Sequence, residues 1–246
     1  MRGGGGGPEA GPRSYFGRDL EAMSHARNYH RWILEELRPF LGKRIVEAGA
    51  GCGNFTPYLL EADPCWLVAM EPSTNMFELL RRSVEHEPRV RPVHGFLADA
   101  VAACPEPPDT LVYVNVLEHV EADGRELALA RDALGPGGRL CVLVPALPAL
   151  YGSVDRAGGH VRRYRRAELE SKVRRAGFRV VESRYFDLPG ALAWWVVYKL
   201  LRSGSLGAAR VCLYDRLVVP LARRIEALRP PPIGKNVLLV AEKGTG

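Results

Sequence analysis

The sequence lacks the cysteine pairs that a disulfide framework or a zinc site would need. Its five cysteines are dispersed, and no two of them stand in a C-x-x-C arrangement. An odd number of unpaired thiols is typical of a reducing compartment, so a cytoplasmic protein is expected. The five are Cys52, Cys65, Cys104, Cys141 and Cys212.

Long hydrophobic runs are also missing. The chain begins with Met1, Arg2 and five glycines, without the apolar stretch of a signal peptide, and residues 1–13 are predicted to be a disordered tail. The longest apolar segment, residues 188–201, is too short to span a bilayer and contains Lys199. Stable membrane insertion is therefore not expected.

Concentrated charge of one sign is scarce as well. The net charge is +6, but the arginines are spread along the chain apart from one cluster at residues 162–166. No appended RNA-binding module is evident, so the expected partner is a small molecule and not a nucleic acid.

What is present is an alternation of short apolar runs and amphipathic segments. It predicts an α/β fold, a mostly parallel sheet with helices on both faces, in one domain over residues 14–246. Residues 14–42 form a helical cap, and residues 188–232 form a helical insertion before the last strand. The predicted strands cover residues 44–48, 66–71, 90–93, 109–114, 139–144, 178–185 and 236–241. The main predicted helices cover residues 19–38, 54–62, 73–84, 124–134, 166–176, 190–202 and 206–228.

The first strand ends in a glycine-rich turn of the form E-x-G-x-G-x-G, from Glu47 to Gly53. Glycines at a strand end let a ligand lie against bare backbone. A dinucleotide site has the spacing G-x-G-x-x-G, whereas here Asn54 occupies the position of the third glycine. The turn therefore argues against a nicotinamide oxidoreductase.

Three further polar side chains follow strand ends. Glu71 ends the second strand, Asp99 follows the third, and Asn115 follows the fourth. In an open α/β sheet these ends meet at the ligand edge. A carboxylate at Glu71 can bind both ribose hydroxyls of a nucleoside, and one at Asp99 can accept from an adenine amino group.

Residues 44–144 together resemble the class I S-adenosylmethionine (SAM) methyltransferases. The resemblance implies a Rossmann-like seven-stranded sheet with an antiparallel last strand, SAM as cofactor and S-adenosylhomocysteine as product. It also implies a division of the cofactor among the motifs, to which the N-terminal helix adds Tyr29 and Trp32 as closing residues. The methionine end would lie on Glu47, Gly49, Ala50, Gly51, Gly53 and Asn54, the ribose on Glu71 and Pro72, the adenine on Asp99 and Ala100, and the sulfonium beside Asn115 and Leu117.

The segment from Tyr151 to Tyr164 is similar to a bacterial subgroup of methyltransferases often grouped as type 11, 12 or 23, which act on small or lipid-like metabolites. His160 is the main candidate for a general base, or else a structural histidine bonded to Asp155; His119 is the second candidate. Arg163 is a candidate clamp for a substrate anion. The predicted substrate-binding residues are Tyr151, Asp155, His160, Arg163 and Tyr164.

The expected reaction is metal-independent O-methylation of a carboxylate or hydroxyl of a metabolite. No metal is expected because Asn115, Glu118 and His119 lack the Asp/Asn cluster of metal-using catechol methyltransferases; a pair of Asp155 and His160 is the remaining alternative. C-methylation of an apolar or prenyl-like acceptor is the main rival. An RNA methyltransferase, and a SAM-binding fold without methyl transfer, also stay open. The apolar helices of residues 188–228 are a lid, a homodimer interface or a membrane-surface contact.

Overall fold

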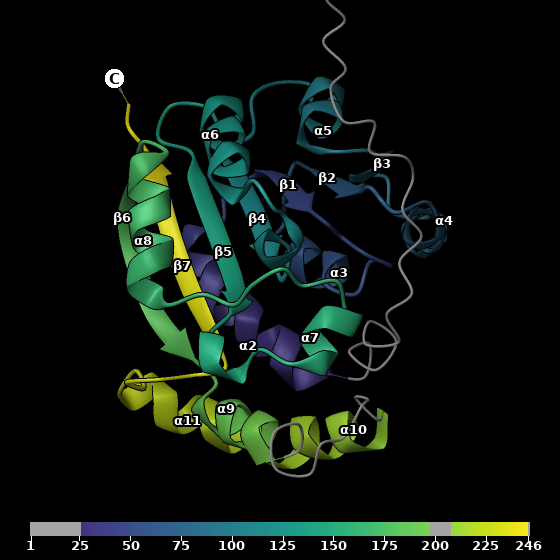
Figure 1. Ribbon diagram of the computed structural model, residues 1–246. Coiled ribbons are helices and arrows are strands. Elements are labelled where there is room, and N and C mark those ends of the chain that lie inside the picture. The colour runs from purple at the N-terminus through teal and green to yellow at the C-terminus, as the bar shows by residue number, and fades with distance from the viewer. Residues whose placement is uncertain (1–25, 197–207, 246) are drawn as a thin grey trace, which may run out of the picture.

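Seven strands form one sheet in the order β3-β2-β1-β4-β5-β7-β6 in the computed structural model, which describes residues 26–196 and 208–245 (Figure 1). Strands β1 to β5 pair in parallel, while β7 runs antiparallel to both β5 and β6. The predicted mostly parallel sheet with an antiparallel last strand is confirmed. The strands are β1 (Arg44–Ala48), β2 (Trp66–Glu71), β3 (Val90–His94), β4 (Thr110–Val114), β5 (Arg139–Pro145), β6 (Phe178–Phe186) and β7 (Asn236–Lys243).

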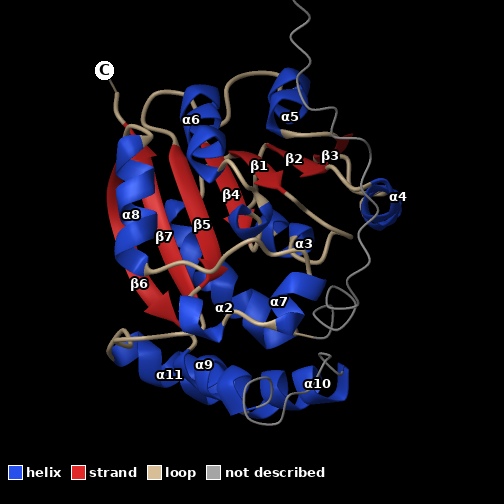
Figure 2. Cartoon of the chain, viewed as in Figure 1, coloured by secondary structure: helices blue, strands red, loops and turns tan. Residues whose placement is uncertain are grey.

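Helices follow the strands on both faces of the sheet (Figure 2). They are α2 (Arg27–Leu37), α3 (Thr56–Leu60), α4 (Thr74–Ser83), α5 (Leu97–Ala103), α6 (Asp123–Ala133), α7 (Ser153–Ala157), α8 (Arg166–Arg175), α9 (Leu188–Trp194), α10 (Ala208–Leu217) and α11 (Val219–Leu228). The short helices α5 and α7 were not predicted. The single helix predicted over residues 206–228 is interrupted at Val218, because Pro220 has no N–H to continue the hydrogen-bond ladder.

The side chains of each central strand alternate between two hydrophobic layers, one on each face of the sheet. Val46 and Leu111 lie in the layer that packs under α5, α6 and α8, whereas their neighbours Ile45 and Val112 lie in the layer under α2, α3 and α4. A strand sends successive side chains to opposite faces, so each central strand contributes to both layers. Two covered faces fix the sheet rigidly and leave the strand ends for function.

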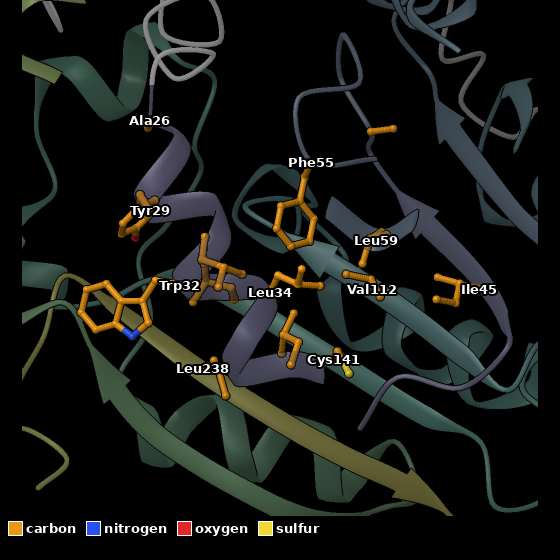
Figure 3. Close-up of a cluster of buried hydrophobic side chains, with 14 of the residues drawn as sticks. Ala26, Tyr29, Trp32, Leu34, Ile45, Phe55, Leu59, Val112, Cys141 and Leu238 are labelled. Atoms are coloured by element: carbon orange, nitrogen blue, oxygen red, sulfur yellow. The ribbon is translucent and has the colours of Figure 1, made fainter. Parts of the chain in front are cut away.

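The helix α2 contributes its apolar face to the second layer (Figure 3). Trp32 is fully buried, its ring centroid lies 4.1 Å from that of Phe186, and its Nε1 donates to Glu36. Tyr29 is buried too, and its hydroxyl donates to Asn236 Oδ1 at 2.9 Å. The expectation that Tyr29 and Trp32 close over a cofactor is thus replaced by a role in the core.

Helices α9, α10 and α11 lie together beyond the carboxyl ends of β5 and β6 (Figure 1). α10 and α11 contact each other and also contact α2. The predicted tail, the start of the predicted cap and part of the predicted insertion lie outside the described residues. Among the described residues, every helix falls short of the length and hydropathy that a bilayer crossing requires.

Replacing Trp32 by alanine tests its assignment to the core. The variant should lose about 3–5 kcal/mol of unfolding free energy, because a buried aromatic ring leaves a cavity that its neighbours only partly fill. Chemical denaturation measures this loss. The matched control is Leu79→Ala on α4, whose side chain is 46% exposed and whose loss should change stability by about 0.5 kcal/mol or less.

Candidate functional site

The carboxyl ends of β1, β2, β3 and β4 meet at one edge of the sheet, because these strands are parallel neighbours (Figure 2). Every sequence motif that predicts cofactor binding lies at or just after one of these ends. The structure therefore brings the four predicted motifs to one edge.

The glycine turn after β1 is built from left-handed backbone. Gly49 and Gly51 both have φ of +60°, and Gly53 has φ of +87°. A Cβ on Gly49 would lie 2.8 Å from a methyl carbon of Val116, so a side chain is excluded by space as well as by conformation. The N–H of Ala50 donates to the carbonyl of Met70 at 2.8 Å, which ties the turn to the end of β2. Asn54 follows the turn, half-buried, just before α3.

Glu47 ends β1 as a buried carboxylate, 4% exposed. The hydroxyl of Thr56, at the start of α3, donates to its Oε2 at 2.6 Å. Burial raises the pKa of Glu47 to about 8, because the charged form is poorly solvated there. A cationic ligand beside Glu47 would restore the charge balance. Thr56 was not predicted, since a threonine at a helix start is usually read only as a cap.

Glu71 ends β2 and lies against the glycine turn. Its Oε2 accepts from the N–H of Gly51 at 2.9 Å, and its Oε1 accepts from the N–H of Ser73 at 2.8 Å. Pro72 lies between, half-buried. Burial raises the pKa of Glu71, an effect that these two hydrogen bonds oppose. The two strand ends are therefore linked through one carboxylate.

The adenine prediction after β3 stays a prediction for Asp99, whose side chain is exposed, but the side chain of Ala100 is buried. Asp99 lies in the first turn of α5, where its Oδ2 accepts from the N–H of Phe96 at 2.9 Å and so stabilises the helix start. Ala100 is fully buried in the hydrophobic layer. The structure also exposes the side chain of Phe96 at this strand end, 56% exposed, which a search for polar ligands overlooks.

After β4 the chain turns sharply. Asn115 has φ of +56° and an exposed side chain, and its N–H donates to the carbonyl of Leu143. A left-handed conformation in a non-glycine residue is a mark of functional turns. Leu117, two residues later, is fully buried, so its side chain belongs to the core and not to the sulfonium side predicted for it.

The segment after β5 is held by a buried carboxylate, Asp155, which is 1% exposed. It accepts from the N–H of Gly152 at 2.8 Å and from Arg163 Nε at 2.8 Å, and its Oδ1 lies 3.2 Å from His160 Nδ1. Arg163 also donates to the carbonyl of Ala146, and its guanidinium lies 4.6 Å from the ring centroid of Trp194. The predicted substrate clamp at Arg163 is therefore wrong for this structure: a guanidinium that is 5% exposed and bound to Asp155 is part of the loop's own framework.

The two tyrosines of this segment have separate roles. Tyr151 is half-buried, and its hydroxyl donates to the carbonyl of His160 at 2.8 Å. Tyr164 is fully buried, and its hydroxyl lies 3.0 Å from the carbonyl of Leu117 and 2.9 Å from Asp123 Oδ2. Tyr151 thus remains beside His160, while Tyr164 braces the loop against the start of α6 and does not face a substrate.

His119 and His160 come together from segments that are distant in sequence. Their ring centroids lie 4.7 Å apart with an interplanar angle of 88°. Burial, assisted by His160, lowers the pKa of His119 to about 4. His119 is therefore a neutral imidazole at physiological pH, and His160 is oriented by its contact with the carboxylate of Asp155.

Glu118 completes this cluster and is the residue that the sequence reasoning missed. It is fully buried, and burial raises the pKa of its carboxyl to about 7. Glu118 stands between Leu117 and His119 in a segment of mixed polarity, which gives no local signal for a buried acid. Its nearness to His160 could not be read from the sequence, because 42 positions of chain numbering, from 118 to 160, separate them.

Comparisons with known proteins agree with this geometry. The sequence profile of a family described as a methyltransferase domain matches residues 20–183. Residues of this chain are 27% identical, over 145 positions, to a tRNA U34 carboxymethyltransferase of Syntrophotalea carbinolica; the match spans 53% of this chain and only 40% of that protein.

Solved structures share the fold at low identity. A SAM-dependent methyltransferase from Mesorhizobium loti superposes with a TM-score of 0.58 at 16% identity, over 85% of this chain and 96% of that one. A SAM-dependent methyltransferase from Archaeoglobus fulgidus gives 0.57 at 15% identity, over 92% and 100%. The cyclase SpnF gives 0.57 at 16% identity, over 89% and 82%. With the family profile covering two thirds of its length, the chain belongs to the methyltransferase-domain family, and it shares the fold of these solved structures.

Proposed function

We propose that the chain binds SAM on the turn after β1 and methylates a hydroxyl oxygen of a small molecule. SAM, when bound, supplies a methyl group already activated on a sulfonium. The donor set fits such a ligand: Glu47 is a buried carboxylate that lacks a cationic partner among the described residues, beside a turn that excludes side chains. Glu71 and Asn115 flank the same edge, and Phe96 offers an exposed ring for the adenine.

The observation that carries the choice of acceptor is the contact between Asp155 and His160. A carboxylate that orients an imidazole and stabilises its protonated form is the arrangement of a general base. An acceptor hydroxyl must lose its proton as the new O–CH3 bond forms and the S–CH3 bond breaks. The cluster of Glu118, His119 and His160 is where that proton is removed.

A carboxylate acceptor loses part of its support because two arginines of the cluster are already paired. Arg163 is paired with Asp155, and Arg162 Nη1 donates to Asp123 Oδ2 at 2.7 Å. Neither guanidinium is left to hold a substrate carboxylate. A hydroxyl needs no such clamp, but it does need the proton acceptor that the cluster provides.

The similarity to a tRNA U34 carboxymethyltransferase supports one alternative, an RNA acceptor. That protein matches about half of this chain, and the chain carries a net charge of +6. If RNA were the acceptor, methyl transfer to total tRNA would fall steeply with added salt, because released counterions drive such binding. The same assay run with small acceptors separates the two functions.

Release of S-adenosylhomocysteine from a panel of matched phenols, alcohols and carboxylic acids tests the proposal. Turnover should occur with hydroxyl compounds, and His160→Ala should lower kcat/KM by about a hundredfold or more while the affinity for S-adenosylhomocysteine stays unchanged. His86→Ala, on the exposed side of the molecule, is the matched control. Methylation of the acids but not of the hydroxyl compounds would refute the choice of acceptor.

Glu47 gives the cofactor site a predicted pH dependence. Its pKa near 8 leaves the carboxyl protonated at neutral pH, whereas an ammonium group favours the ionised form. Binding of S-adenosylhomocysteine should therefore release a proton, and the affinity should rise by up to about tenfold per pH unit between about pH 6 and 7.5.

Calorimetry in two buffers of different ionisation enthalpy measures both quantities. Glu47→Gln should bind more weakly and without pH dependence over this window, while Glu78→Gln, whose side chain is half exposed on α4, should behave as the parent does. An equal pH dependence in Glu47→Gln would remove Glu47 from the ammonium site.

A further inference from the structure

The carboxylate of Glu118 is buried without a hydrogen-bond partner. Its side chain is fully inaccessible, and neither Oε1 nor Oε2 has a partner among the described residues. A buried carboxylate with no compensating contact is costly, so such groups in proteins are paired or coordinate a metal ion. The position of Glu118 therefore indicates a missing ligand.

Two imidazoles converge on this carboxylate. One ligand atom each from Glu118, His119 and His160 can be chosen so that all three lie within 4.8 Å of one another. Glu118 and His119 come from the short turn after β4, and His160 comes from the loop after α7. The N–H of Val161 donates to the carbonyl of Glu118 at 2.8 Å, which fixes these segments against each other.

Both imidazoles are also oriented from outside the cluster. His160 Nδ1 contacts the carboxylate of Asp155 at 3.2 Å, and the ring of His119 hydrogen-bonds to the backbone of Gly159. Metal-binding histidines are typically held in this way, by a carboxylate or a backbone carbonyl on the second ring nitrogen. The outer contacts set the direction in which each ring presents its other nitrogen.

The charges around the cluster leave room for a cation. Glu118 and Asp155 are two carboxylates, and the guanidinium of Arg163 lies with Asp155 and balances one of them. The imidazoles are neutral when they ligate a metal. A net negative charge remains at a site whose donor atoms are two nitrogens and one carboxylate.

We propose that Glu118, His119 and His160 bind a divalent transition-metal ion of the zinc, cobalt or manganese class. Two histidines with one carboxylate suit these ions, whereas calcium and magnesium take oxygen ligands. Three protein ligands would leave a position open, in which the ion would bind the acceptor hydroxyl and lower its pKa. In that case the ion, and not His160 as a free base, would assist loss of the proton. That role rests on the proposed function, but the binding itself does not. The proposal departs from the expectation of a metal-independent enzyme.

Metal binding is tested on the full chain after dialysis against a chelator. Titration with Co²⁺ should show about one ion per chain, with visible absorption bands typical of nitrogen and oxygen ligands and without the intense thiolate band that cysteine ligation would give. Glu118→Gln and His160→Ala should each weaken Co²⁺ binding by at least about tenfold. Glu121→Gln and His86→Ala, both exposed and outside the cluster, are the matched controls.

Binding of S-adenosylhomocysteine to the same variants separates loss of the metal from loss of the fold. Its affinity should stay unchanged in Glu118→Gln, which retains the shape of the parent side chain. Failure of the parent chain to bind Co²⁺, Zn²⁺ or Mn²⁺, or equal binding in the variants and their controls, would overturn the metal site. Hydroxyl methylation that survives chelation would leave a metal-free base as the mechanism and overturn the catalytic role alone.

A second feature is independent of this site: the outer face of α10 and α11. Its exposed apolar side chains recur at nearly every fourth residue and include Leu228, which is 89% exposed. They are Leu213, Leu217, Leu221, Ile225 and Leu228. A continuous apolar stripe of this kind on a helical surface marks a contact with a membrane or with another protein.

The exposed charges of α10 and α11 are all of one sign, although Arg223 is paired with Glu35 of α2 at 3.0 Å. Asp215 and Glu226 are both buried, where they accept from the backbone N–H groups of Tyr29 and Leu188 respectively. Every exposed charged residue in the described segment 208–229 is an arginine. These are Arg210, Arg216, Arg223, Arg224 and Arg229.

We infer that this face rests on an anionic lipid surface. Apolar side chains that enter the interface and arginines that meet lipid phosphates are the features of a helix lying in the plane of a membrane. A second copy of the chain would place arginines against arginines, so charge complementarity favours lipid. Helices α10 and α11 lie past the carboxyl ends of β5 and β6 (Figure 1).

Sedimentation with vesicles tests this inference. The full chain should bind vesicles that contain phosphatidylglycerol and not vesicles of phosphatidylcholine alone, and binding should weaken with salt. Leu217→Asp together with Leu221→Asp should reduce binding by at least about tenfold, while Leu129→Asp, at an exposed site on α6, should not. Absence of vesicle binding, with a dimer in light scattering that the double variant abolishes, would identify a second copy as the occupant instead.

Discussion

The segment after β5 depends on the buried carboxylate of Asp155. It binds the N–H of Gly152, the guanidinium of Arg163 and the ring of His160, so one side chain fixes a loop of twelve residues. Burial opposes its ionisation, yet these contacts hold its pKa below the ordinary value. Without it, Arg163 would be a buried unpaired cation, and His160 would have no fixed orientation.

The predicted cofactor side is organised by different contacts, in which buried carboxylates accept hydrogen bonds from the backbone and from a hydroxyl. The turn after β1 donates to Glu71 from β2, while Glu47 from β1 accepts from Thr56 on α3. Each carboxylate therefore links one strand end to a neighbouring element. Asn115, predicted for the cofactor side, and Glu118, beside His160, lie on the same short turn after β4.

The sequence was sufficient for the fold because alternation and strand-end acids are local signals. The residue ranges of the strands follow from apolar runs that each span one element, whereas the antiparallel last strand was implied by the resemblance to class I methyltransferases. The site was predictable only in part. Trp32, Ala100, Leu117 and Tyr164 were assigned to ligands from their motif positions, but whether a side chain faces the core depends on packing that no local pattern records.

The errors around Arg163 and Glu118 have a common physical origin. A guanidinium in an arginine-rich stretch looks available until its partner is located, and Asp155 reaches Arg163 only once α7 folds. Likewise, Glu118 looks like a surface charge until the distant His160 joins its neighbour His119 beside it. Ion pairing and ligand convergence are tertiary properties, so charge counting along the chain misplaces both residues.

The reversal of β7 has an architectural consequence. Because β7 runs antiparallel to β6, Phe186 pairs with Asn236, and the connection between these strands begins and ends at the same edge of the sheet. Such a connection does not have to cross the sheet, so the sheet sets no minimum length for it. Helices α9 to α11 occupy it. Evolution can therefore exchange this whole segment without disturbing a single strand of the sheet.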